Sequence, residues 1–130
     1  MNIEPRTLEH RTHHMTRQVL AVDLKDDGVV ESYRDYHRRV WPEVLESLRT
    51  AGVVDVQIYL LGRRLVMIAD LEDGADLRRA FASRMASHPR VAEWERLMMS
   101  LQQPAPGARD GEWWTAMEPV FEYRFPAARA

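Results

Sequence analysis

Two hydrophobic periods alternate along the 130 residues, and their order limits the folds open to the chain. Apolar residues at every second position are typical of β-strands, and this period covers residues 17–24, 54–61, 65–71 and 119–125. Apolar residues at spacings of three and four are typical of amphipathic helices, and this period covers residues 29–51, 74–86 and 89–101. The predicted order is therefore strand, helix, strand, strand, helix pair, strand.

This βαββαβ order is the split βαβ of ferredoxin-like folds. It predicts an α+β domain in which a four-stranded antiparallel sheet carries its helices on one face. The other sheet face also has apolar residues, so we expect a second copy of the chain to cover it in a homodimer. The length fits a single domain, predicted over residues 17–130, after a loose N-terminal extension over 1–16 that shows no period.

The helix predicted over residues 29–51 carries the side chains with the most obvious chemistry. Tyr33, His37 and Trp41 recur at spacings of four on its apolar stripe. Pro42 lies inside the pattern and has no N–H for the carbonyl of Arg38, so we expect the helix to kink there. The predicted kink falls one turn after His37.

Composition excludes several classes of function. The formal charge is −2 without any basic block, so nucleic acid is not an expected partner. The chain has no cysteine, which excludes disulfides, a cysteine nucleophile and thiolate metal sites. No apolar run approaches the roughly 20 residues of a membrane span, and the N-terminus lacks the apolar stretch of a signal peptide. We therefore expect a soluble, cytoplasmic protein. His10, His13 and His14 lie in a segment without a period, and we expect no metal site there.

His37 could give and take protons near neutral pH, and Tyr33 could hold a hydroxyl group by a hydrogen bond. The same residues could equally be large side chains on the buried face of a helix, and spacing alone favours that interpretation. Trp94 is equally ambiguous on the apolar stripe of the later helix. Trp113 and Trp114 could close over a ligand or lock the preceding loop onto the core, and locking is favoured for at least one of them.

Four segments of the chain resemble the L-rhamnose mutarotase family. They are YRDYHRRVWPEVLESLRTAG (33–52), IYLLGRRLVMI (58–68), HPRVAEWERLM (88–98) and GEWWTAMEPVFEY (111–123). The resemblance implies a dimeric α/β-barrel form of the ferredoxin-like fold and the interconversion of the α and β anomers of a 6-deoxy-L-hexose. It implies that His37 is the catalytic residue, acting as a proton donor, and that Tyr33 and Trp94 bind the sugar.

Two positions depart from the rhamnose enzymes of the family. Val56 stands where those enzymes have a sugar-binding tyrosine, and Glu93 stands where they have a tryptophan beside the position of Trp94. The segments DLKDD, YRDYHRRVWPEV and QIYLLGRRLVMI also resemble a branch described as L-fucose mutarotase. L-fucose is therefore slightly favoured over L-rhamnose as the expected monosaccharide. Mutarotation involves no redox change, so no cofactor is expected.

Two other functions fit the same small barrel. One is a cofactor-free or haem-handling monooxygenase, whose members also use a histidine and aromatic residues. The other is a sugar-binding module without catalytic activity. The Tyr33–His37–Trp41–Pro42 string and the GEWW segment favour the mutarotase over the monooxygenase.

Overall fold

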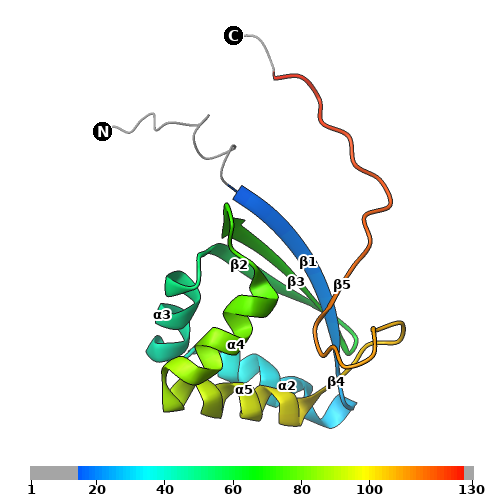
Figure 1. Cartoon of the computed structure of the whole chain (residues 1–130). Coiled ribbons are helices and arrows are strands. Elements are labelled where there is room, and N and C mark those ends of the chain that lie inside the picture. The colour runs from blue at the N-terminus through cyan, green and yellow to red at the C-terminus, as the bar shows by residue number, and fades with distance from the viewer. Residues whose placement is uncertain (1–14, 128–130) are drawn as a thin grey trace.

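A computed structural model describes residues 15–127 and contains a curled antiparallel sheet in the form of a half-barrel, with helices gathered on its concave side (Figure 1). The strand order is β2-β3-β1-β4, and a short β5 also pairs with β1. The strands are β1 (Met15–Leu24), β2 (Val53–Leu61), β3 (Arg64–Glu72), β4 (Gln102–Gln103) and β5 (Thr115–Ala116). This arrangement confirms the predicted α+β fold class.

The β2–β3 hairpin is confirmed, and its register explains the inner face of the sheet. A two-residue turn joins the strands, and Gly62 adopts a φ of 63° there, which side chains other than glycine rarely tolerate. Ile58 pairs with Met67, and Leu65 pairs with Val22 of β1. Since alternate side chains share a face, these apolar residues all point toward the helices. Asp55, Gln57 and Tyr59 of β2 alternate with them and are exposed on the outer face.

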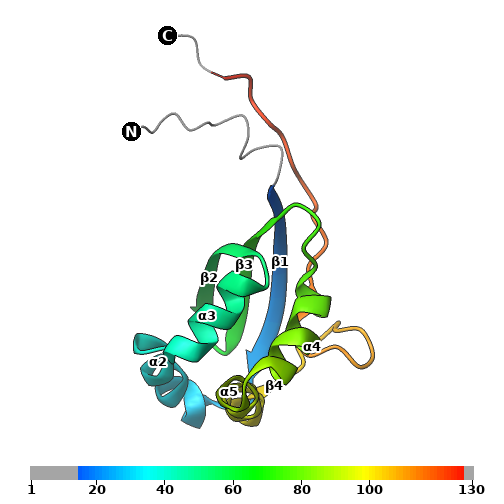
Figure 2. The same ribbon diagram turned by 60° about the vertical axis from the view of Figure 1, so that its left-hand side comes forward.

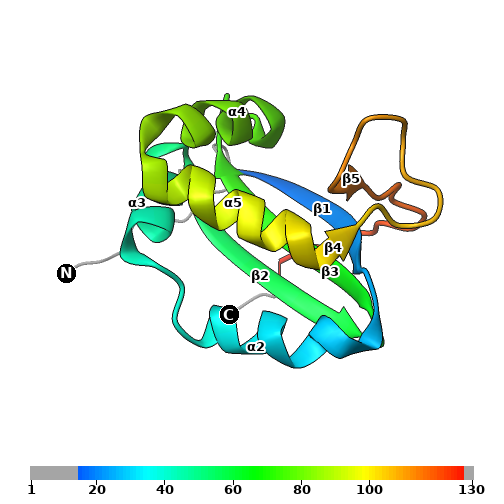
Figure 3. The same ribbon diagram turned by 90° about the horizontal axis from the view of Figure 1, so that it is seen from below.

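The helix predicted over residues 29–51 is instead two helices, which corrects the expectation of a kink. After a 3-10 turn, η1 (Asp27–Val29), the first helix is α2 (Val30–Arg38) and the second is α3 (Pro42–Thr50). The residue before a proline avoids the helical region, and Trp41 accordingly has φ −62° and ψ 138°. Pro42 then starts α3 at a position that needs no N–H donor. The chain changes direction between the two helices (Figure 3).

The helix pair predicted from the second half of the chain is confirmed as α4 (Leu77–Ser87) and α5 (Pro89–Leu101). His88 separates the two helices as the N-cap of α5, where its ring nitrogen accepts a hydrogen bond from the Arg90 N–H at 3.0 Å. The buried side of α5 carries Val91, Trp94, Glu95 and Met98. Figure 2 shows α3 in front of β2 and β3, α4 beside β1, and α5 below them, where it packs against both other helices.

The strand predicted over residues 119–125 is wrong for this chain on its own. The C-terminal segment pairs with β1 only at β5, and its last bond to the sheet is from the Met117 N–H to the Val19 carbonyl at 2.8 Å. Beyond this point the chain runs away from the domain in an extended conformation (Figure 1). Pro119 has no N–H to continue the ladder. Alternation predicts a strand only when a neighbouring strand is available, and this segment has none within the described chain.

Candidate active site

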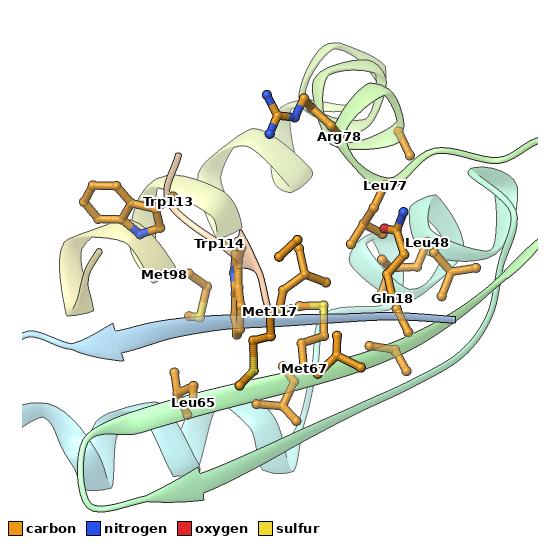
Figure 4. A pocket seen from close by; sticks show the side chains of 18 of the residues that line it. Gln18, Leu48, Leu65, Met67, Leu77, Arg78, Met98, Trp113, Trp114 and Met117 are labelled. Carbon is orange, nitrogen blue, oxygen red and sulfur yellow. The ribbon is translucent and has the colours of Figure 1, made fainter. Parts of the chain in front are cut away.

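The inner face of the half-barrel and the helices enclose an open trough of about 2000 Å³. Leu65 and Met67 of β3 form part of its floor, and the view into it shows Trp114 between Met98 and Met117, with Trp113 farther out on the side of Met98 (Figure 4). The residues predicted as site residues, Tyr33, His37 and Trp94, all line the trough. Its polar lining includes Arg84, Glu95 and Gln102.

Tyr33 and His37 lie one turn apart on α2, and their rings stack with centroids 4.2 Å apart and planes at 28°. The Nδ1 atom of His37 lies 2.9 Å from the Tyr33 carbonyl oxygen. A carbonyl only accepts hydrogen bonds, so this contact assigns the proton of the neutral imidazole to Nδ1. Nε2, on the opposite edge of the ring, then keeps a free lone pair. Burial of the ring lowers the pKa of His37, which favours the neutral form near pH 7.

Trp94 of α5 supports the His37 ring from a second helix. Its ring centroid lies 5.4 Å from that of His37 in an edge contact and 5.1 Å from that of Trp41. Trp41 lies in the break between α2 and α3, where the Arg90 guanidinium carbon sits 3.7 Å from its ring centroid. Trp94 is only 4% exposed, so it belongs to the core as well as to the trough lining. Aromatic contacts from two helices, α2 through Tyr33 and α5 through Trp94, therefore fix the orientation of His37.

The hydroxyl end of Tyr33 meets a residue that sequence analysis did not single out. The Gln102 side chain lies near enough to the Tyr33 hydroxyl to oppose the rise in its pKa. The Oε1 atom of Gln102 accepts a hydrogen bond from the Trp113 Nε1 at 2.8 Å. Trp113 therefore locks the loop that follows α5 onto the core, as predicted for at least one of the two tryptophans. Burial raises the pKa of Tyr33 well above its ordinary value, so its hydroxyl stays protonated at neutral pH.

Two buried charges in the trough were also missed by sequence analysis. Arg84 of α4 and Glu95 of α5 form an ion pair at 3.2 Å, and Arg84 also donates to the Ser47 hydroxyl of α3 at 2.8 Å. Glu95 occupies an inward position among the apolar residues of α5, which was a signal available in the sequence. The partner Arg84 carried no comparable signal, because only the packing of α4 against α5 brings it to Glu95.

The two positions that depart from the rhamnose enzymes have different surroundings. Val56 lines the trough from β2. Glu93 is exposed and pairs with Arg90 at 3.4 Å, beside the Trp41 ring that Arg90 covers. Val56 is therefore the departure that changes the lining of the trough itself.

Residues 15–127 contain neither a cluster of metal-ligating side chains nor a helix suited to a membrane. No group of three or more His, Cys, Asp or Glu side chains there could hold a metal ion. His10, His13 and His14 lie outside the described residues. None of the described helices is long and apolar enough to cross a membrane. The cytoplasmic location stays a prediction of the sequence.

Comparison with known proteins assigns this arrangement to a family. The L-rhamnose mutarotase profile matches residues 17–123, which is most of the chain. The chain belongs to the L-rhamnose mutarotase family. A protein named L-fucose mutarotase from Xanthomonas campestris pv. campestris is 38% identical over 110 residues, covering 82% of this chain and 87% of that protein. An L-rhamnose mutarotase from Burkholderia cenocepacia is 33% identical over 94 residues, covering 72% and 86% respectively.

A solved structure extends the family likeness to the fold. The L-rhamnose mutarotase FA22100 of Formosa agariphila superposes with a TM-score of 0.60 at 20% identity, covering 84% of this chain and 99% of that one. Mutarotases interconvert sugar anomers, so membership of this family makes the chain a carbohydrate isomerase. These relatives give no support to the monooxygenase or to a non-catalytic sugar-binding module.

Proposed function

We propose that this mutarotase interconverts the α and β anomers of L-fucose, with L-rhamnose as the second candidate. Both sugars are 6-deoxy-L-hexoses that one scaffold could accommodate. The relative named L-fucose mutarotase is more similar to this chain than the relative named L-rhamnose mutarotase. Val56 also leaves the trough without the tyrosine that rhamnose enzymes carry at that position. These two observations support L-fucose.

The observation that carries the mechanism is the environment of His37. Ring opening of a pyranose breaks the C1–O5 bond while a base removes the O1 proton and an acid protonates O5. With Nδ1 bonded to the Tyr33 carbonyl and its pKa lowered, neutral His37 has Nε2 available as the base at O1. When the aldehyde has rotated and the ring closes, the same imidazolium returns its proton to O1. One residue thus accepts the proton in one direction and donates it in the other.

Tyr33 and Trp94 bind the sugar in this proposal. The Tyr33 hydroxyl keeps its proton and can donate a hydrogen bond to a sugar oxygen next to the His37 ring. Trp94 offers an apolar indole surface to the C–H groups or the methyl group of the sugar. Both are rigidly packed, so they would hold the sugar without losing much side-chain freedom on binding.

The substitution His37→Ala tests the mechanism. General acid–base catalysis contributes roughly 10² to 10⁴ in rate, so we expect catalysed exchange between the anomers to disappear while the fold persists. Saturation-transfer NMR between the α and β anomeric protons of L-fucose measures the exchange, and circular dichroism measures the fold. L-rhamnose and D-galactose serve as comparison sugars. Unchanged exchange in the variant would remove His37 from the mechanism.

We further propose that the protein works as a homodimer in which the C-terminal segment, residues 117–127, packs on a second copy. This segment leaves its own domain with Val120, Phe121, Tyr123 and Phe125 largely exposed. An extended, alternating apolar segment of this kind is costly to leave in water and suits addition to another sheet. Light scattering should give twice the chain mass for the full chain, and a chain ending at Glu118 should be monomeric. An unchanged mass after truncation would exclude the segment from the interface.

A further inference from the structure

We propose that Arg84 and Glu95 form a hydroxyl-binding wall of the sugar site and hold two neighbouring hydroxyl groups of the sugar. This inference rests on the proposed function, because it assigns the ligand to the same trough. It adds two residues from α4 and α5 to a site whose other members come mainly from α2. The wall would orient the sugar so that its anomeric carbon faces His37.

The ion pair does not use all the hydrogen-bonding atoms of Arg84 and Glu95. Arg84 uses Nε for the Ser47 hydroxyl and Nη2 for Glu95 Oε2, and both charged side chains line the trough. Within residues 15–127, no hydrogen bond engages Arg84 Nη1 or Glu95 Oε1. Neither atom is sealed from solvent, because Glu43 Oε1 alone is buried without a partner in that part of the chain. Arg84 therefore keeps one donor atom, and Glu95 one acceptor atom, that no hydrogen bond among the described residues uses.

A buried ion pair needs a reason to be kept at this position. Both residues are 9% exposed, and taking two charges out of water costs more than one imperfect contact returns. A mere brace between helices would work as well with apolar side chains of the same volume. A sugar diol fits the open donor and acceptor, since each hydroxyl both donates and accepts hydrogen bonds. Hydrogen bonds to charged groups are also stronger than those between neutral groups.

The wall is continuous with the residues assigned to catalysis. Glu95 follows Trp94 in sequence, and Trp94 contacts the His37 ring at 5.4 Å between centroids. The negative charge of Glu95 also acts on the Tyr33 hydroxyl, contributing to the raised pKa of that group. Glu95, Tyr33 and His37 also line the same trough, so one sugar bound there could meet all three.

The substitution Glu95→Gln tests the wall, with Glu46→Gln as the matched control. Glu46 is an exposed carboxylate of α3 that also pairs with an arginine, Arg49. Saturation-transfer NMR at increasing L-fucose concentration separates KM from kcat. We expect Glu95→Gln to raise KM about tenfold or more with a smaller change in kcat, and Glu46→Gln to leave both unchanged. With the wild-type protein, a monodeoxy L-fucose that lacks a contacted hydroxyl should show a KM raised by a similar factor. With Glu95→Gln, the KM for this deoxy sugar should be little higher than the KM for L-fucose itself.

Different outcomes would contradict the hydroxyl-binding wall and the proposed function. Equal KM values for Glu95→Gln and Glu46→Gln would overturn the wall. It would also be overturned if, for every deoxy sugar, the effect of the missing hydroxyl on KM simply added to the effect of Glu95→Gln. Absence of L-fucose exchange by the wild-type protein would overturn L-fucose as the proposed substrate, and calorimetric titration of L-fucose would then still decide the wall. Near-UV circular dichroism checks that each variant is folded. Should Glu95→Gln not fold, Arg84→Lys replaces it, because lysine keeps the charge but lacks the planar guanidinium. This variant should also raise the KM for L-fucose, and removal of a contacted sugar hydroxyl should then raise KM little further.

Discussion

Two arginine–carboxylate pairs on opposite faces of the sheet make the same bond in different surroundings. Arg17 of β1 faces Asp70 of β3 on the outer face, where the pair is joined at 2.8 Å and Arg17 is largely exposed. Arg84 and Glu95 meet at 3.2 Å inside the trough, where both are buried. In the outer pair, hydrogen bonding raises the pKa of Arg17 and lowers that of Asp70. In the inner pair, burial lowers the pKa of Arg84 and raises that of Glu95.

The opposite shifts show which force dominates at each place. On the outer face water solvates the charges, so the bond between partners favours the ionised forms. In the trough, loss of water disfavours both charges by more than their mutual attraction restores. The outer pair is thus an ordinary surface contact of small energetic value. The inner pair is held in an environment that opposes it, which is typical of groups kept for binding or chemistry.

Breaking the inner pair should give the largest effect on stability. Arg84→Met leaves the Glu95 carboxylate buried without its partner, so we expect a loss of about 3–5 kcal/mol in the free energy of unfolding. Asp70→Asn breaks the outer pair as a control, and its effect should be roughly a fifth of that or less. Urea denaturation at pH 7 followed by circular dichroism measures both. Similar losses from the two substitutions would mean that the faces do not differ as the shifts indicate.

Removing both inner charges sharpens the same comparison. The double variant Arg84→Met with Glu95→Leu replaces the pair by apolar side chains of similar volume, so most of the stability lost in Arg84→Met should return. If the pair only braced the helices, the double variant would keep its affinity for sugar. If the pair binds hydroxyl groups, KM for L-fucose should stay raised in a stable protein. Stability and KM measured on one preparation distinguish the two roles.

The sequence could predict what depends on local pattern. The strand and helix periods located β1, the β2–β3 hairpin and the α4–α5 pair, and the Tyr33–His37 spacing correctly put both side chains into one region. Pro42 predicted an interruption, but the helical period continues across it, which favoured one kinked helix. The chain forms two helices because Trp41, which precedes Pro42, adopts an extended conformation.

Features that depend on distant partners could not be predicted in this way. Residues 119–125 alternate like a strand, yet strand formation requires a neighbour that the described chain does not supply. The Arg84–Glu95 pair spans two helices, and the Gln102–Trp113 bond spans a loop, so neither has a sequence period. The roles of His37, Tyr33 and Trp94 came from the family resemblance, because periodicity alone favoured a core position for them.

The smallest expected effect is the pH dependence of anomer exchange. It tests whether burial disfavours the charged form of His37 as it does for Arg84 and Glu95. Burial lowers the pKa of His37 below its usual 6.5, so the neutral base persists to lower pH than for an exposed histidine. Catalysed exchange should be flat above pH 7, fall less than about twofold between pH 7.5 and 6.5, and decline as pH drops through the lowered pKa. The folded state binds fewer protons than the unfolded chain in this range, so stability declines in the same direction and must be monitored by circular dichroism. NMR exchange rates between pH 5 and 8, corrected for uncatalysed mutarotation, give the profile. A rate that rises as the solution is acidified would show that the imidazolium is the active form at the start of the reaction, and His37 would then act first as the acid at O5.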